Sequence, residues 1–135
     1  RFNRLVVAGT GRNLFESDKR WKKKVVNAVR TGAAETPELR YFAQLPESPE
    51  ADRGALAAFL ERPDPREFTS DLLARVTMPV LVVIGDADYA GPADTLVEAL
   101  PDAEMVVLPG VDHFATPKNF GFIDAALDFI EAQPF

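Results

Sequence analysis

Two pairs of titratable side chains stand directly after apolar runs in the second half of the chain. Asp86 and Asp88 follow one run, and Asp112 and His113 follow the next. A carboxylate that accepts a hydrogen bond from one imidazole nitrogen fixes the tautomer and leaves the other nitrogen able to take a proton. His113 is the only histidine of the chain. These residues therefore predict an Asp–His dyad with either Asp86 or Asp88 as the carboxylate, while Asp112 is expected to shape its loop.

The elements that must position this dyad are three strands, each predicted from a short run that is apolar at every position: residues 5–8, 80–84 and 105–108. Such runs are typical of parallel strands that helices cover on both faces. Amphipathic helices are expected around residues 21–31, around residues 56–60 and over residues 118–132. Strands that alternate with helices predict an α/β fold with a parallel sheet. Because the carboxyl ends of neighbouring parallel strands lie ~5 Å apart, their loops can bring the dyad together.

The first connection between strands is far longer than one helix requires, which predicts an inserted helical subdomain. We therefore expect a core strand and loop at residues 1–11 and a helical cap insertion at residues 12–70. Residues 71–135 then form a carboxyl-terminal α/β core that carries the acid and the histidine. Insertions of this kind usually cover a site.

The composition argues against several classes of function. The formal net charge of −6 argues against electrostatic binding to nucleic acid or to a membrane surface. The absence of cysteine removes disulfides and thiolate ligands, and one histidine among scattered carboxylates gives no metal-ligand spacing. The segment Gly9-Thr10-Gly11 lacks the third glycine of a dinucleotide fingerprint. We expect a cytoplasmic protein without metal or cofactor that acts on a small molecule, and we interpret the basic residues 19–24 as a solvated helix face.

The motifs around the dyad carry a family resemblance. Residues 78–88 read Met-Pro-Val-Leu-Val-Val-Ile-Gly-Asp-Ala-Asp, and residues 108–114 read Leu-Pro-Gly-Val-Asp-His-Phe. They resemble the carboxyl-terminal part of the α/β-hydrolase fold, as found in capped bacterial esterases, haloperoxidases and epoxide hydrolases. The resemblance implies that Asp88 is the catalytic acid and His113 the catalytic base. It also implies that residues 4–11 form the strand after the nucleophile-bearing helix, with the cap inserted after that strand.

The nucleophile of this family is missing from the sequence. No Gly-x-Ser-x-Gly elbow is present, and Ser17, Ser48 and Ser70 lie in polar, helix-capping or loop contexts. The resemblance therefore implies that the nucleophile precedes this chain, in an amino-terminal half or another chain that pairs with the strand edge at Leu5. The expected parent is a hydrolase of a small ester, lactone or related acyl or C–C substrate, and the fragment alone is expected to be inactive.

Two alternatives remain open. With an Asp nucleophile, the resemblance fits epoxide hydrolases or dehalogenases, in which His113 activates water alone. A protein that keeps the fold without using the triad is a binding protein. The residue at the nucleophile position discriminates between these readings.

Overall fold

The computed structural model describes residues 2–16, 18–63 and 68–131, and the chain divides into two compact units. The first unit comprises residues 1–17 and 67–135, and the second comprises residues 18–66. The elements of the first unit are β1 (Leu5–Ala8), η1 (Arg12–Leu14), α4 (Ser70–Leu73), β2 (Val80–Gly85), α5 (Asp94–Ala99), β3 (Ala103–Leu108), η3 (Thr116–Lys118) and α6 (Phe120–Phe129). Those of the second unit are α1 (Lys19–Thr31), α2 (Pro37–Gln44), η2 (Leu45–Glu47) and α3 (Arg53–Glu61).

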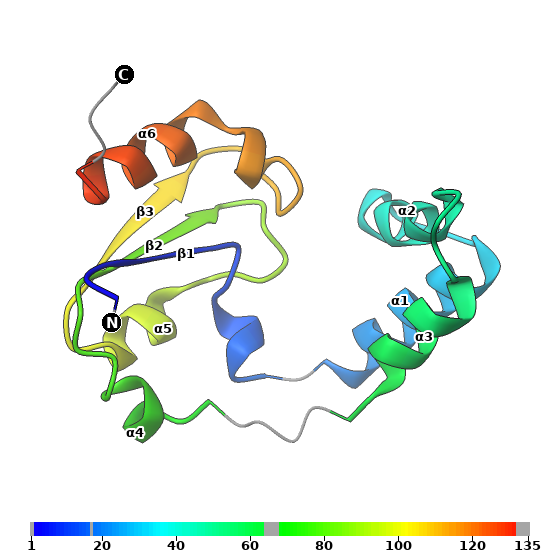
Figure 1. The fold of residues 1–135 in the computed structure, drawn as a ribbon, viewed down its shortest axis with the longest axis horizontal. Coiled ribbons are helices and arrows are strands. Elements are labelled where there is room, and N and C mark those ends of the chain that lie inside the picture. Colours follow the sequence, from blue (N-terminus) through cyan, green and yellow to red (C-terminus); the bar gives the residue numbers. More distant parts are fainter. Residues whose placement is uncertain (1, 17, 64–67, 132–135) are drawn as a thin grey trace. The chain divides into compact units, whose positions relative to one another are not determined.

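The strands form one parallel sheet in the order β1-β2-β3, as Figure 1 shows. In the register, Val6 lies opposite Leu81, and Val83 lies opposite Val106. The predicted α/β class with a parallel sheet is therefore confirmed. Because β2 and β3 are parallel, the loop with Asp86 and Asp88 and the loop with Asp112 and His113 both begin at the carboxyl ends of the strands.

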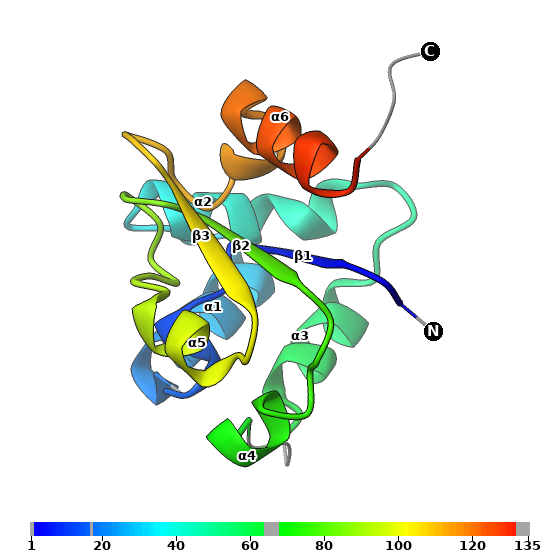
Figure 2. The same ribbon diagram turned by 90° about the vertical axis from the view of Figure 1, so that its left-hand side faces the viewer.

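Helices cover both faces of β2, whose six residues are all buried. Val82 packs in a cluster with Leu96 of α5, whereas Leu81 packs on the other face with Phe122 of α6. Figures 1 and 2 show these two helices on opposite sides of the strands. Burial of β2 from both sides fixes the loop that follows it, which carries Asp88.

The two outer strands are less buried than the sequence predicted. Leu5 in β1 is 39% exposed, and Met105 and Val107 in β3 are 37% and 48% exposed. The expectation that all three apolar runs are covered on both faces is therefore wrong for the outer strands of this unit. An apolar run indicates that a strand tends to be buried, but it does not show where the strand lies in the sheet. Here β1 and β3 are the outer strands, and α5 and α6 cover the central strand β2 most completely.

The second unit is a small helical assembly built on the amphipathic helix α1. The Asp18 carboxylate caps its amino end by accepting hydrogen bonds from the main-chain N–H groups of Arg20 and Trp21, and the helix ends at Gly32 in the left-handed region (φ 76°). Val25 of α1 packs with Leu39 of α2 in the core of this unit. The helix end agrees with the expected end near residue 31.

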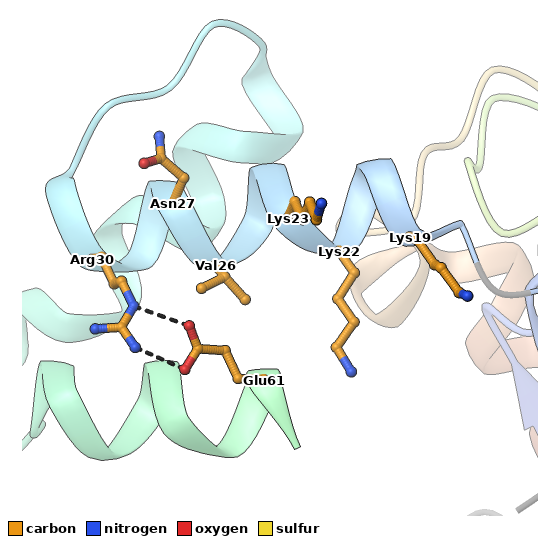
Figure 3. A pocket seen from close by; sticks show the side chains of 7 residues that line it. All are labelled: Lys19, Lys22, Lys23, Val26, Asn27, Arg30 and Glu61. Carbon is orange, nitrogen blue, oxygen red and sulfur yellow. Dashed lines mark hydrogen bonds and ion pairs between the residues drawn. The ribbon is translucent and has the colours of Figure 1, made fainter. Parts of the chain in front are cut away.

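A groove of about 490 Å³ lies beside α1, with α3 contributing to its lining (Figure 3). Nη2 of Arg30 forms an ion pair with Oε2 of Glu61 at 2.7 Å, and Nζ of Lys22 donates a hydrogen bond to the carbonyl of Arg62 at 2.8 Å. These contacts tie α3 and the residue after it to α1. The neighbouring Lys19 and Lys23 are exposed, as expected for a solvated helix face.

Two boundaries differ from the sequence prediction. Residues Arg12–Leu14 were expected in the insertion, but the N–H of Arg12 donates to the carbonyl of Pro92 at 2.8 Å, which ties this turn to the first unit. Helix α6 begins at Phe120 instead of residue 118, because Thr116–Lys118 forms a separate 3-10 turn and Asn119 caps the helix. Its predicted end at residue 132 lies outside the described residues. Of the helices in the described ranges, none is long and apolar enough to cross a membrane.

Candidate active site

The carboxyl ends of the three strands converge on one imidazole. His113 follows β3, Asp88 lies three residues after β2, and Gly9 directly follows β1. All three belong to the first unit. This is the place where the general geometry of parallel α/β sheets positions a ligand site.

Asp88 presents a carboxylate that is shielded from solvent but has hydrogen-bond partners. Its side chain is 0% exposed, and its Oδ1 accepts a hydrogen bond from the N–H of Ala90 at 2.8 Å. The N–H of Asp88 itself donates to the carbonyl of Gly85 at 3.1 Å, which starts a tight turn directly after β2. The turn thus holds the carboxylate through bonds that do not involve His113, as a preorganised site requires.

Nδ1 of His113 lies 3.1 Å from Oδ1 and 3.1 Å from Oδ2 of Asp88. A proton on Nδ1 can be shared with both oxygens, and Nε2 then keeps its lone pair as the acceptor nitrogen. The His113 side chain is 30% exposed, so a reacting group can reach the ring while the carboxylate stays covered. The structure thus brings together the imidazole and one of the two candidate carboxylates.

The other two aspartates hold the loops. Oδ1 of Asp86 accepts a hydrogen bond from the N–H of Gly110 at 2.6 Å, which joins the loop after β2 to the loop after β3. Oδ1 of Asp112 accepts from the N–H of Ala115 at 2.8 Å, and its carbonyl accepts from the hydroxyl of Thr116 at 2.9 Å. Asp112 therefore has the loop-shaping contacts expected for it.

Three residues that were not predicted for the site lie against the imidazole: Gly9, Tyr89 and Phe114. A Cβ added at Gly9 would lie 3.0 Å from Cε1 and 3.1 Å from Nδ1 of His113, and this glycine has a φ of 64°. The ring centroids of Tyr89 and His113 are 4.7 Å apart, with 39° between the ring planes. Phe114 adds an edge contact, with its ring centroid 5.4 Å from that of His113. The available sequence signal was a glycine at the end of a strand next to the one that carries the acid.

The environment of Tyr89 disfavours its ionised form. Partial burial raises the pKa of Tyr89 from 10.0 to about 12, and the negative charge of the neighbouring Asp88 adds to the effect. The phenol of Tyr89 is therefore neutral at neutral pH.

No serine in the described residues is hydrogen-bonded to His113. Ser48 follows the 3-10 turn η2 in the second unit, and Ser70 begins α4; Ser17 lies outside the described residues. Within the described ranges, no group of three or more Asp, Glu or His side chains is arranged to hold a metal ion. A cavity of about 360 Å³ adjoins Asp86 and Asp88, with Met105 and Val107 on its β3 wall.

No protein-family model and no curated protein sequence matches this chain, but its fold matches solved structures. A hydrolase from Pseudomonas aeruginosa PA01 matches over 98% of this chain, with a TM-score of 0.64 and 21% sequence identity. A thermophilic esterase from Thermogutta terrifontis matches over 97%, with a TM-score of 0.63 and 20% identity. A bromoperoxidase from Bacillus anthracis matches over 97%, with a TM-score of 0.60 and 16% identity.

These matches are partial on the side of the solved structures. The chain covers 57% of the P. aeruginosa hydrolase, 56% of the T. terrifontis esterase and 59% of the B. anthracis bromoperoxidase. It therefore spans somewhat more than half the length of the proteins whose fold it shares.

Proposed function

Because this chain has the fold of the carboxyl-terminal part of an α/β-hydrolase, we propose that it supplies the acid and base of a hydrolase. The parent protein hydrolyses a small ester, lactone or related acyl or C–C substrate. His113 is the general base and Asp88 is its acid partner. The observation that carries this proposal is the 3.1 Å separation between Nδ1 of His113 and both carboxylate oxygens of Asp88.

The proposed reaction uses the free nitrogen of the imidazole. A nucleophile from a segment outside this chain loses its hydroxyl proton to Nε2 of His113 as its oxygen attacks the substrate carbonyl. The imidazolium then returns the proton to the leaving group, which departs as an alcohol. In the second half, His113 takes a proton from water as the water oxygen attacks the acyl carbonyl. The imidazolium then returns this proton to the oxygen of the nucleophile, so that the acid product leaves and the nucleophile regains its hydroxyl.

Asp88 supports each proton transfer without itself becoming protonated. Its carboxylate holds the proton on Nδ1, so that Nε2 is the acceptor, and its charge stabilises the imidazolium. Because its side chain is fully covered, solvent screens this interaction little. The names of two fold neighbours, a hydrolase and an esterase, support the choice of ester substrates as the first to test.

The test compares the parent protein, with the segment encoded upstream restored, to its His113→Ala variant on a p-nitrophenyl ester. We expect turnover to fall by several powers of ten, because the base is lost. The 135-residue chain by itself is expected to release no more p-nitrophenol than a heat-denatured control. Undiminished turnover in His113→Ala would refute the assignment of the base. Turnover by the isolated chain that mutation of Ser17, Ser48 or Ser70 abolishes would refute the external nucleophile.

The nucleophile also decides between the readings left open by the sequence. An Asp at that position favours an epoxide hydrolase or dehalogenase, in which His113 activates water only. A Gly or Ala favours a binding protein that keeps the fold. Reading the residue encoded at that position, together with the ester assay, separates these outcomes.

A further inference from the structure

The turn that buries the acid also places an aromatic ring against the base. Tyr89 lies between Asp88, whose Oδ1 accepts a hydrogen bond from the N–H of Ala90 at 2.8 Å, and Gly91, whose N–H donates to the carbonyl of Asp88 at 3.1 Å. These two bonds fix the main chain on both sides of Tyr89. Its ring is half-buried and meets the His113 ring at a centroid distance of 4.7 Å.

The same turn is bonded to the segment that follows β1. The N–H of Arg12 donates to the carbonyl of Pro92 at 2.8 Å, and a Cβ added at Gly11 would lie only 2.6 Å from that carbonyl oxygen. Gly9 is tied to β2 by its N–H, which donates to the carbonyl of Val83 at 3.0 Å. The Gly9 main chain and the Tyr89 ring therefore belong to one hydrogen-bonded frame around the imidazole.

The geometry of the dyad depends on the rotation of the His113 ring. Nδ1 is the same distance from both Asp88 oxygens, and turning the ring about its bond to Cβ would take Nδ1 away from them. The tilted contact with the Tyr89 ring, at 39° between the ring planes, opposes this rotation, since aromatic pairs prefer a restricted set of tilts and offsets. A methyl group on Gly9 would lie 3.0 Å from Cε1 and 3.1 Å from Nδ1, which is tighter than ordinary contact, so the ring would have to shift.

We propose that Tyr89 is a positioning residue, whose ring, together with the main chain of Gly9, holds the His113 imidazole with Nδ1 toward Asp88 and Nε2 available for the reaction. The role in turnover rests on the proposed function, whereas the role in setting the tautomer concerns this chain alone. Tyr89 acts through His113 and contacts no reacting atom. The proposal assigns this role to the ring, so Tyr89→Phe should preserve it.

The test measures directly which nitrogen of the His113 imidazole carries the proton. Since His113 is the only histidine, two-bond ¹H–¹⁵N correlation spectra of the ¹⁵N-labelled chain contain the signals of one ring, and the ¹⁵N shifts show which nitrogen carries the proton. We expect the neutral form with the proton on Nδ1 in the unaltered chain and in Tyr89→Phe. Tyr89→Leu, which keeps an apolar side chain but removes the ring, should give a mixture with the other tautomer. An unchanged tautomer in Tyr89→Leu overturns the proposal, and so does loss of the tautomer in Tyr89→Phe.

Two further variants guard against a purely structural effect. Tyr41→Leu removes the only other tyrosine, which lies in the second unit, and should leave the His113 signals unchanged. Gly9→Ala places a methyl group about where it meets the ring and should shift the tautomer as Tyr89→Leu does. If Tyr89→Leu loses the dispersed amide spectrum of a folded chain, Gly9→Ala and Tyr89→Phe decide the question. A Gly9→Ala chain that is folded with an unchanged tautomer then overturns the proposal.

The activity of the parent protein gives a second readout. Tyr89→Leu should lower kcat roughly tenfold and leave KM within about twofold. Tyr89→Phe should keep the kcat of the unaltered protein. A loss that appears in KM instead of kcat contradicts positioning of the base. The two proposals fail separately: if His113→Ala does not change turnover, the proposed function is wrong, but the tautomer of His113 still reports whether Tyr89 positions the ring.

Discussion

Asp88 and His113 are separated by 25 residues in the sequence, yet Nδ1 of the imidazole lies 3.1 Å from each oxygen of the carboxylate. The contact forms because β2 and β3 are parallel neighbours, so that their following loops leave the sheet side by side. The same arrangement gives Asp86 a different partner, the N–H of Gly110. Two aspartates one residue apart thus have separate tasks, which can be measured separately.

Asp88→Asn should lower the turnover of the parent protein about 10⁴-fold, because the amide can hold the imidazole in the wrong tautomer and cannot stabilise the imidazolium. Asp86→Asn is the matched control. Its side-chain oxygen can still accept the hydrogen bond from Gly110, so turnover should stay within about threefold. The measurement is kcat/KM on a p-nitrophenyl ester. A larger loss in Asp86→Asn than in Asp88→Asn would move the acid to position 86.

Tyr89 should ionise at a higher pH than a free tyrosine, and its ionisation should lower the free energy of unfolding. Its pKa is raised from 10.0 to about 12, so folding favours the neutral phenol. This contribution to stability is complete below pH 10 and is lost as the pH rises toward about 12. In Tyr41→Phe, which keeps Tyr89 as the only tyrosine, the absorbance of the tyrosinate band should have its midpoint near 12. A midpoint close to 10.0 would show that the ring is not buried against His113.

Gly85→Ala should destabilise the first unit strongly. An added Cβ would lie 1.8 Å from the carbonyl oxygen of Val111, a main-chain atom that can move only with its loop. We expect the free energy of unfolding to fall by about 3 kcal/mol in urea denaturation. Gly110→Ala is the control: its Cβ meets nothing within 4 Å, and its φ of 68° should cost only about 1 kcal/mol. Equal losses in the two variants would contradict the close approach at Gly85.

The sequence was sufficient to predict the strands and the fold. Runs that are apolar at every position predicted all three strands, and the first of them, Leu5–Ala8, has the predicted bounds. The predicted likeness to the carboxyl-terminal part of the α/β-hydrolase fold is confirmed by the solved structures that the chain matches. These features follow from local sequence patterns, so they can be predicted without knowledge of the tertiary contacts.

The remaining features depend on contacts between distant segments. The proximity of Gly9 and Tyr89 to His113 is not visible in their own sequence neighbourhoods, because it arises from the order of strands in the sheet. The exposure of Met105 and Val107 follows from the edge position of β3, which an apolar run does not reveal. The catalytic roles of His113 and Asp88 stay predictions, and the variants above test them.

Main-chain bonds join the two loops at the carboxyl edge of the sheet. The N–H of Asp86 donates to the carbonyl of Leu108 at 3.1 Å, and the N–H of Ala87 donates to that of Val111 at 3.2 Å. These bonds between the two loops fix the distance between Asp88 and His113. The connection through α5 does not determine this distance. At the opposite end of β3, Leu100 is buried in the core and the carbonyl of Asp102 accepts a hydrogen bond from the N–H of Val80 at 2.9 Å, whereas Pro101 between them is exposed. A change of chain length that leaves the dyad in place is therefore expected to be tolerated only at Pro101.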